Sequence, residues 1–250
     1  MHHQGNWRHV RSLMSRLAPI MLIPILSGCL LFSKTSMFSR GDGWYHYDPT
    51  TLPQALERGE PLSLTPEATV ATSDVLDSKP VQWTQADFLQ IADAFQQQEL
   101  AESLSAWKFS QLWFELYCAD VAFGPQHLTI ELYREYPRDE GGMRLVQHSV
   151  LISPRRNQVG WTENELWPVL GRQPSLDLTR IKVPVEQALR IAEAQGGQAA
   201  RETAQNQCLI YLLLTASRAQ NGWEVTYSGF APRGSLFKLY VNEETGRHRR

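Results

Sequence analysis

Apolar residues recur at helical spacing in two segments that lie one hundred residues apart. In the first segment they are Phe88, Ile91, Ala92 and Phe95. This spacing of i, i+3, i+4 and i+7 predicts a helix with one buried face. Thr84 can cap its start, with Asp87 three residues on and Trp83 and Phe88 packed around the cap. We expect this helix to run to about Gln98.

The second segment repeats the first almost residue for residue. Leu89–Ala94 reads Leu-Gln-Ile-Ala-Asp-Ala, and Leu189–Ala194 reads Leu-Arg-Ile-Ala-Glu-Ala. Pro184 near the start and Gly196 with Gly197 at the end are typical of helix boundaries. These residues predict a second helix that ends at the two glycines.

Each helix is followed by three segments with strand character. They are 107–118, 128–136 and 145–152 after the first helix, and 208–216, 223–228 and 236–241 after the second. The later segments alternate apolar and polar residues, as strands with one buried face do. Turn residues at 154–157 and 242–246 close each set. The run 208–214 is almost continuously apolar, which predicts a central strand covered on both faces. A charge at Leu212 or Leu213 should then unfold its unit.

The order helix, strand, strand, strand therefore appears twice. It predicts an α+β protein of two tandem helix-plus-three-stranded antiparallel meander units, at residues 81–175 and 176–250. Either the units arose by duplication, or two amphipathic helices share residues by coincidence. The repeated order of elements favours duplication.

Residues 29–80 show neither helical nor strand periodicity, and we interpret them as a flexible tether. Their prolines are Pro49, Pro53, Pro61, Pro66 and Pro80. The aromatic run Trp44–Tyr47 is an exception within this segment. Either it packs on the folded units, or it presents a flat surface to a sugar or peptide. Large exposed aromatic clusters are rare, which favours packing.

Residues 1–28 have the layout of a secretory signal peptide. Three arginines, without any acidic residue, precede the apolar run 17–26. That run is about half of the ~20 residues that a transmembrane helix needs. Leu26-Ser27-Gly28-Cys29 resembles the lipobox of bacterial lipoproteins, which implies cleavage before Cys29 and a lipid on its thiol. Two or more acyl chains anchor a protein firmly. In that family Leu30, in place of Asp, favours the outer membrane.

The charge balance argues against nucleic acid as a partner. The chain has 24 Lys and Arg residues and 26 Asp and Glu residues. Removal of residues 1–28 takes away three arginines, which leaves 21 basic residues and a formal charge of −5. No basic stripe of the kind that binds phosphate backbones remains.

Three cysteines are present, and the lipobox assigns Cys29 to the lipid. Cys118 and Cys208 remain as a pair in an oxidising compartment. Both fall within apolar strand segments, so they either form a disulfide or stay as two buried thiols. Neither belongs to a CxxC motif or lies near a histidine at ligand spacing, which argues against a metal site.

Residues 183–247 resemble a PepSY-type module. The opening helix reads Val-Pro-Val-Glu-Gln-Ala-Leu-Arg-Ile-Ala, and the closing hairpin contains Trp223-Glu224-Val225 and the strand Leu239–Val241 with its turn to Gly246. Asn242 stands where the family usually has Asp. The resemblance implies a non-catalytic envelope module, inhibitory towards peptidases in some relatives.

No arrangement of residues typical of catalysis is evident. The mature chain contains four histidines, none in HxxxH or HExxH spacing: His46, His127, His148 and His248. No GxSxG elbow or phosphate-binding loop is present. His148 alternates with Val146 and Val150, which favours a core position over a catalytic base.

The charged pairs are expected to be solvated rather than functional. The carboxylate pairs are Glu131 with Glu135 and Glu163 with Glu165, and the basic groups are Arg155 with Arg156 and the terminal residues 247–250.

These observations favour a non-enzymatic lipoprotein of the bacterial cell envelope. Its Cys29 lipid would hold it outside the cytoplasmic membrane or in the outer membrane, where it would bind an envelope protein or peptide. No cofactor or metal is expected. Two alternatives stay open: an inhibitor or modulator of an envelope peptidase, and an enzyme with an unrecognised site. A cleft that gathers His127 or His148 with carboxylates would favour the enzyme, and histidines on separate faces would argue against it.

Overall fold

The computed structural model describes residues 43–66, 80–137, 143–166, 174–216, 222–230 and 233–250. All of them belong to one compact unit, Phe38–Arg250. The signal segment and the lipobox with Cys29 lie outside the described residues. No helix within the described ranges is long and apolar enough to cross a membrane.

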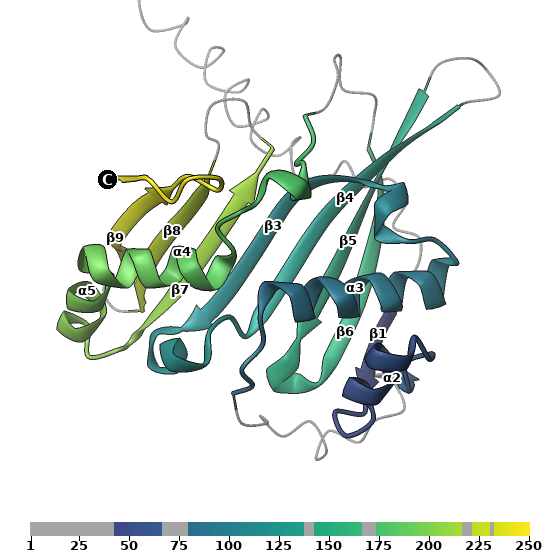
Figure 1. Cartoon of the computed structure of the whole chain (residues 1–250), viewed down its shortest axis with the longest axis horizontal. Helices are drawn as coiled ribbons and strands as arrows, with labels where there is room; N and C mark the ends of the chain where they lie inside the picture. Colours follow the sequence, from purple (N-terminus) through teal and green to yellow (C-terminus); the bar gives the residue numbers. More distant parts are fainter. Residues whose placement is uncertain (1–42, 67–79, 138–142, 167–173, 217–221, 231–232) are drawn as a thin grey trace, which may run out of the picture. The chain divides into compact units, whose positions relative to one another are not determined.

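The described strands form one antiparallel sheet in the order β10-β9-β8-β7-β3-β4-β5-β6-β1-β2 (Figure 1). The N-terminal strands are β1 (Gly43–Tyr47), β2 (Leu64–Pro66), β3 (Lys108–Tyr117), β4 (His127–Pro137), β5 (Met143–Ser153) and β6 (Gln158–Leu166). The C-terminal strands are β7 (Cys208–Thr215), β8 (Trp223–Phe230), β9 (Arg233–Val241) and β10 (His248–Arg249). The helices are α2 (Leu52–Arg58), α3 (Gln85–Leu100), α4 (Val185–Ala192) and α5 (Gln198–Thr203).

The predicted α+β fold of two tandem meander units is wrong. The chain forms a ten-stranded, sheet-dominated structure with few helices, in which β3 pairs with β7 from Gln111 opposite Thr215 to Tyr117 opposite Leu209. An unpaired strand edge exposes a row of backbone N–H and C=O groups. Pairing β3 with β7 covers two such edges at once. Local periodicity locates six of the described strands, β3, β4, β5, β7, β8 and β9, but carries no information about this long-range partner.

Residues 43–66, which the sequence places in the tether, contain β1, α2 and β2. Strand β1 pairs with β6 from Gly43 opposite Trp161 to His46 opposite Gln158. Tyr45 contacts α3, where its ring lies 5.8 Å from that of Phe95 and its hydroxyl donates to Glu99 at 2.9 Å. The aromatic run is therefore ordered by packing on the sheet and on α3.

Helix α3 begins where its sequence predicts. Thr84 and Asp87 form a reciprocal capping box, and the rings of Trp83 and Phe88 lie 5.3 Å apart. The helix ends at Leu100, two residues beyond the prediction. The predicted start is confirmed.

The second helix does not end at its glycines. After α4, the π-helical turn Glu193–Gly197 leads directly into α5, with Gly196 at a φ of 120°. A Cβ on Gly197 would lie 2.4 Å from the hydroxyl oxygen of Tyr227. These glycines bend the helix and let it approach the sheet, so their role differs from the predicted helix stop.

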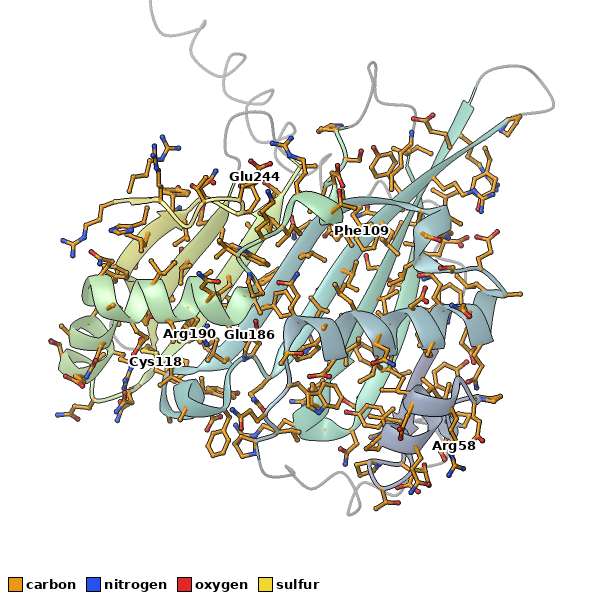
Figure 2. All side chains as sticks on the ribbon, in the orientation of Figure 1. Arg58, Phe109, Cys118, Glu186, Arg190 and Glu244 are labelled. Atoms are coloured by element: carbon orange, nitrogen blue, oxygen red, sulfur yellow. A yellow bond between two sulfur atoms is a disulfide. The ribbon has the colours of Figure 1, made fainter. Side chains whose placement is uncertain are left out.

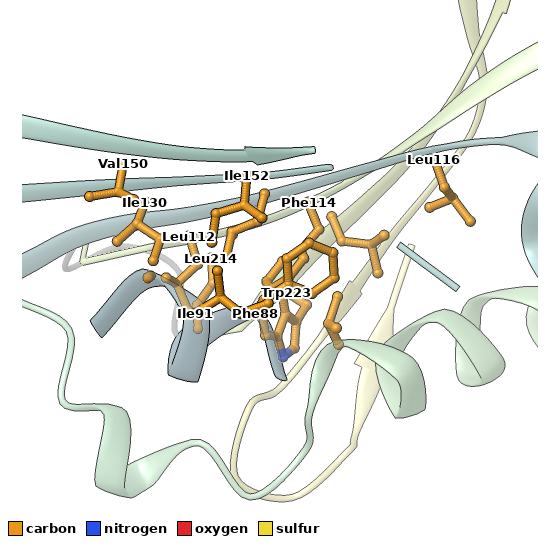
Figure 3. Packing of buried hydrophobic residues seen from close by; sticks show 14 of the residues in the cluster. Phe88, Ile91, Leu112, Phe114, Leu116, Ile130, Val150, Ile152, Leu214 and Trp223 are labelled. Atoms are coloured by element: carbon orange, nitrogen blue, oxygen red, sulfur yellow. The ribbon is translucent and has the colours of Figure 1, made fainter. Parts of the chain in front are cut away.

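The helices lie on one side of the sheet (Figure 1). Between them and the sheet is the core, formed by side chains such as Phe88, Ile91, Phe114, Ile130 and Trp223 (Figure 3). We call this side of the sheet the covered face and the other side the open face. Burial alternates along β7, with Leu212 fully buried and Leu213 half-buried. The prediction of a strand covered on both faces is therefore wrong.

Two bridges join the N-terminal and C-terminal strands across the β3–β7 pair. At the strand ends a disulfide links Cys118 to Cys208, with Cα atoms 5.3 Å apart (Figure 2). On the covered face the starts of α3 and α4 exchange hydrogen bonds. The Val185 N–H donates to the Gln85 side chain at 2.9 Å, and the Gln85 N–H donates to the carboxylate of Glu186.

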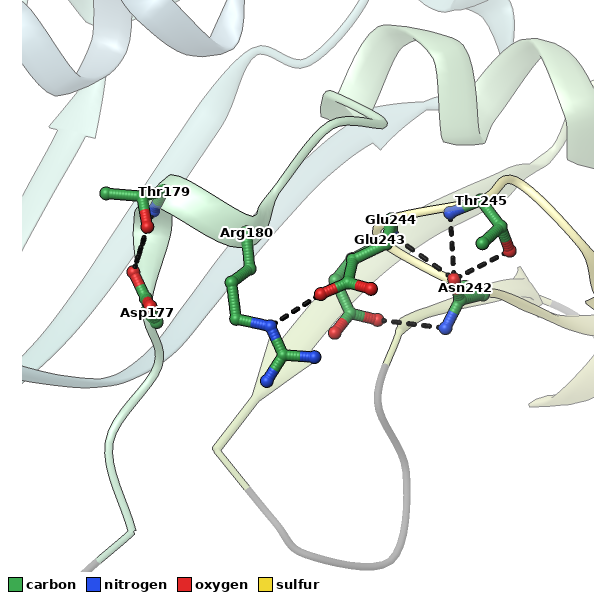
Figure 4. A network of polar contacts seen from close by, with 7 residues as sticks. All are labelled: Asp177, Thr179, Arg180, Asn242, Glu243, Glu244 and Thr245. Atoms are coloured by element: carbon green, nitrogen blue, oxygen red, sulfur yellow. Dashed lines mark hydrogen bonds and ion pairs between the residues drawn. The ribbon is translucent and has the colours of Figure 1, made fainter.

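The turn after β9 is held by Asn242 (Figure 4). Its Oδ1 accepts hydrogen bonds from the backbone N–H groups of Glu244 and Thr245 and from the Thr245 hydroxyl, at 2.7 to 3.2 Å. Glu244 forms an ion pair with Arg180, which fixes the turn against the segment that leads into α4. The amide oxygen of Asn242 accepts these hydrogen bonds as a carboxylate oxygen would, so the turn forms with Asn in place of the usual Asp.

Candidate functional site

Aromatic and aliphatic side chains cluster at the centre of the open face. We call this cluster the aromatic seam: Trp113 and Tyr117 on β3, Leu209, Tyr211 and Leu213 on β7, and Phe230 on β8. Trp113 is 40% exposed, and Tyr117 and Phe230 are each 46% exposed. Two ring pairs meet edge to face, Trp113 with Tyr211 at 5.9 Å and Tyr117 with Phe230 at 6.4 Å. Exposed apolar clusters are often sites of contact with a partner or ligand, which makes the aromatic seam the candidate site.

A cleft of about 630 Å³ adjoins the Tyr117 end of the aromatic seam. Its lining includes Trp44, Glu115, Tyr117, His127, Arg155 and Phe230. A smaller hollow of about 260 Å³ lies at the other end, beside Trp113, Tyr211 and Leu213. The two hollows and the seam between them form a continuous band along β3 and β7.

Trp44 lines this cleft because β6 carries a glycine beneath it. Trp44 pairs with Gly160 across β1 and β6, and a Cβ on Gly160 would lie 2.6 Å from the Trp44 ring. The missing side chain lets the ring lie directly on the sheet. The sequence favours packing of the run Trp44–Tyr47 on the folded units, and this packing is observed. The Trp44 ring also lines the cleft.

Glu115 is a half-buried carboxylate that lines the cleft. In register it lies opposite Tyr211 on β7 and His127 on β4. Burial raises the pKa of Glu115 above its usual range. The pKa of Tyr211 is raised by its own burial and by the nearby charge of Glu115. Among the residues that the structure describes, no hydrogen bond or ion pair reaches the Glu115 carboxylate.

His127 lies in the cleft as a neutral ring. Its Nε2 is 3.3 Å from the Thr129 hydroxyl. Burial lowers the pKa of His127, and the positive charge of Arg156 lowers it further. At the cleft rim Arg155 pairs with Asp120 at 2.7 Å and lies over the Tyr117 ring at 5.3 Å. This ion pair joins the 3-10 turns Cys118–Phe123 and Pro154–Arg156.

His148 lies on the covered face, away from the cleft. It is 1% exposed, and its ring stacks on that of Trp161 and lies tilted to that of Trp107, each 5.2 Å away. Burial lowers its pKa to about 4, and the negative charge of Glu102 opposes this shift only in part. Its Nδ1 has no hydrogen-bond partner in the described part of the chain. The predicted core position is confirmed.

The remaining predicted charges do not converge. Glu131 is half-buried on the open face, where burial raises its pKa, while Glu135 pairs with Lys108 at 3.7 Å. Glu163 lies opposite His148 in register. Within the described ranges, no group of three His, Cys, Asp or Glu side chains could hold a metal ion.

The cleft does gather one histidine with carboxylates, the arrangement that we expected of an enzyme. Glu115, His127 and Ser153 all line it. Among the described residues, the side-chain hydroxyl within hydrogen-bond reach of the His127 ring is that of Thr129, at 3.3 Å, and His148 lies on the other face of the sheet. An activated nucleophile requires a base within hydrogen-bond reach. Thr129 and His127 form a pair of this kind, and within the described residues no carboxylate is hydrogen-bonded to the His127 ring to orient it.

Sequence reasoning missed the aromatic seam and Glu115. The signal was available in β3, where Trp113, Glu115 and Tyr117 alternate with the buried Leu112, Phe114 and Leu116. A strand with large apolar residues at both odd and even positions has apolar side chains on both faces, so its open face is apolar as well.

Comparison with known proteins adds no functional assignment. No protein-family model, curated protein or solved structure matches this chain. No family is shown. The function must therefore be argued from the open face itself.

Proposed function

We propose that this chain is a lipid-anchored protein of the bacterial cell envelope that binds another envelope protein or a peptide on its open face, without catalysing a reaction. The lipobox at Leu26–Cys29 supports the anchor, and Leu30 after it favours the outer membrane. The lipid on Cys29 is its contact with the membrane. The aromatic seam and the adjoining cleft are its contact with the partner.

One observation carries this proposal: large aromatic side chains are exposed on the open face of β3 and β8, whose residues on the covered face are buried in the core. Trp113, Tyr117 and Phe230 stay 40 to 46% exposed while their strand neighbours are buried. Leaving such rings in water forgoes roughly 25 cal/mol for each Å² of apolar surface that a partner could bury. Tyr and Trp are also the residues that most often dominate binding energy at protein interfaces.

Site-specific photo-crosslinking in the intact envelope tests the proposal. A benzophenone amino acid replaces Trp113 on the open face, and a matched variant carries it at Gln97, which is exposed on α3. We expect a discrete adduct from position 113 that disappears when Tyr117 and Phe230 are changed to Ala. The same adducts from both positions, or none from position 113, would contradict the proposal.

A second candidate function follows from His127 and Glu115 in one cleft. If the cleft were catalytic, the crosslinked partner would be converted to a new product, and His127→Ala would stop that conversion. We expect the partner to be recovered unchanged with the wild-type protein, and binding to survive His127→Ala. Mass spectrometry of the recovered partner distinguishes the two functions.

A further inference from the structure

The charges of the open face are paired, with few exceptions. The ion pairs on this face and at the cleft rim are Lys108–Glu135 at 3.7 Å, Glu224–Lys238 at 2.6 Å and Asp120–Arg155 at 2.7 Å. The carboxylates of Glu115 and Glu131 have no such partner among the described residues. Both are half-buried, and burial raises the pKa of each. A partly desolvated carboxylate without a counter-charge is unfavourable, and a cation that approached it would remove that cost.

Glu115, unlike Glu131, lies within the aromatic seam. Trp113 and Tyr117 flank it along β3, and Tyr211 lies opposite it on β7. Glu131 lies opposite Gln111 on β3 and Ser149 on β5, so its direct cross-strand neighbours are polar. An aromatic ring attracts a cation through its face, most strongly for Trp. Glu115 thus combines a carboxylate with three rings, which is the chemistry that suits an ammonium or guanidinium group.

The neighbouring positive charges do not occupy this position. Arg155 is held by Asp120 at the rim. Arg156 is exposed on the turn after β5, where its charge acts on His127. His127 itself is neutral near pH 7, because burial and Arg156 both lower its pKa. Glu115 is therefore the uncompensated charge of the seam, and charge complementarity specifies a cationic occupant.

We propose that the partner inserts a lysine or arginine side chain beside Glu115, between the rings of Trp113, Tyr117 and Tyr211. This inference rests on the proposed function, and it names the chemistry of the partner. The cationic side chain belongs to an extended peptide segment, whose apolar residues lie along the rest of the aromatic seam. The hollow of about 260 Å³ beside Trp113 and Leu213 accepts one of these apolar side chains.

Matched synthetic peptides test this proposal on the whole lipoprotein in a nonionic detergent. The probes are acetyl-Leu-Ala-Lys-Ala-Leu-amide, whose Lys and two Leu side chains share one face when the peptide is extended, and the same peptide with norleucine or glutamate in place of lysine. Binding is measured by fluorescence anisotropy of a labelled peptide. We expect the lysine peptide to bind about ten-fold more tightly than the norleucine peptide, in the range of a carboxylate pair with a cation–π contact. The glutamate peptide should bind most weakly, and added salt should reduce the differences.

Two variants assign the effect to one carboxylate. Glu115→Gln should reduce the lysine preference to about one, because it keeps the shape of the site and removes the charge. Glu131→Gln is the matched control, since Glu131 is also a half-buried carboxylate on the open face. It should leave the preference unchanged. A preference lost in Glu131→Gln but kept in Glu115→Gln would overturn the assignment.

The outcomes separate this inference from the proposed function. If all three peptides bind equally and Trp113→Ala weakens them all, the open face binds peptides but the cationic subsite is wrong. If a neutral oligosaccharide such as chitotriose binds to the seam, and the peptides do not, both the cationic subsite and the peptide partner are wrong. If no probe binds and position 113 gives no crosslink, the proposed function fails together with the inference.

Discussion

The two faces of strand β7 differ in what surrounds them, although both carry aliphatic side chains. Ile210, Leu212 and Leu214 are at most 1% exposed beneath the helices, and Leu209 and Leu213 are half-buried on the open face. The covered face contributes to stability, because its side chains leave water when the chain folds. The open face can contribute the same kind of energy to binding. The same substitution should therefore lower the unfolding free energy at a covered residue of β7 and weaken binding at its neighbour on the open face.

A charge at either of two neighbouring leucines provides the largest expected contrast. Leu212→Glu places an unpaired carboxylate in the core and should cost more than about 4 kcal/mol of unfolding free energy. Leu213→Glu lies on the open face and should cost about 1 kcal/mol or less. Denaturant unfolding of the purified protein measures both. Equal destabilisation by the two variants would mean that β7 is covered on both faces after all.

The disulfide between Cys118 and Cys208 is the next largest contribution. It joins the end of β3 to the start of β7 across a sequence separation of 90 residues. The double variant Cys118→Ala with Cys208→Ala should lose about 2–4 kcal/mol, because the unfolded chain is no longer constrained. Unfolding with and without a reductant provides the measurement, and the double variant should no longer respond to the reductant. An unchanged midpoint in the reduced wild type would contradict the predicted role of the bridge.

The pH dependence of stability tests the burial of His148 on the covered face. Burial lowers the pKa of His148 from 6.5 to about 4, so the neutral ring is favoured in the folded state. Its contribution is complete above about pH 6.5 and is lost as the pH falls towards 4. By pH 4 the loss should be on the order of 2–3 kcal/mol.

His148→Phe keeps an aromatic ring in contact with Trp107 and Trp161, and the Phe ring does not bind a proton. The pH dependence of its stability between pH 7 and 4 should be smaller than that of the wild type by this amount. Parallel stability curves for the two proteins would show that His148 does not titrate in this way.

The sequence predicts individual elements better than their arrangement. The capping box of Thr84 and Asp87 and the alternation around Val146 and Val150 are local, and the helix and strand that they predict are observed. The pairing of β3 with β7 depends on residues about one hundred positions apart, which no local pattern encodes. The continuation of the helix past Gly196 depends on Gly197, because a Cβ at that residue would clash with the Tyr227 hydroxyl of β8.

The candidate site was still harder to predict. A single Glu115 in an alternating strand is typical of a solvated position, and its burial comes from Tyr211 and His127 on neighbouring strands. The sequence places Trp44 in a tether. Its ring packs on Gly160 of β6, and β6 has no clear periodicity from which this contact could be predicted. Cys29 and the lipobox lie outside the described residues, so the anchor stays a prediction.

The most direct test of the open face as the binding surface is the affinity of Trp113→Ala for the partner identified by crosslinking, compared with that of Gln97→Ala. We expect at least a ten-fold loss for Trp113→Ala, as for an aromatic residue at the centre of an interface. Its unfolding free energy should stay within about 1 kcal/mol of the wild type. Gln97→Ala should change neither quantity. Wild-type affinity in a folded Trp113→Ala protein would contradict the account.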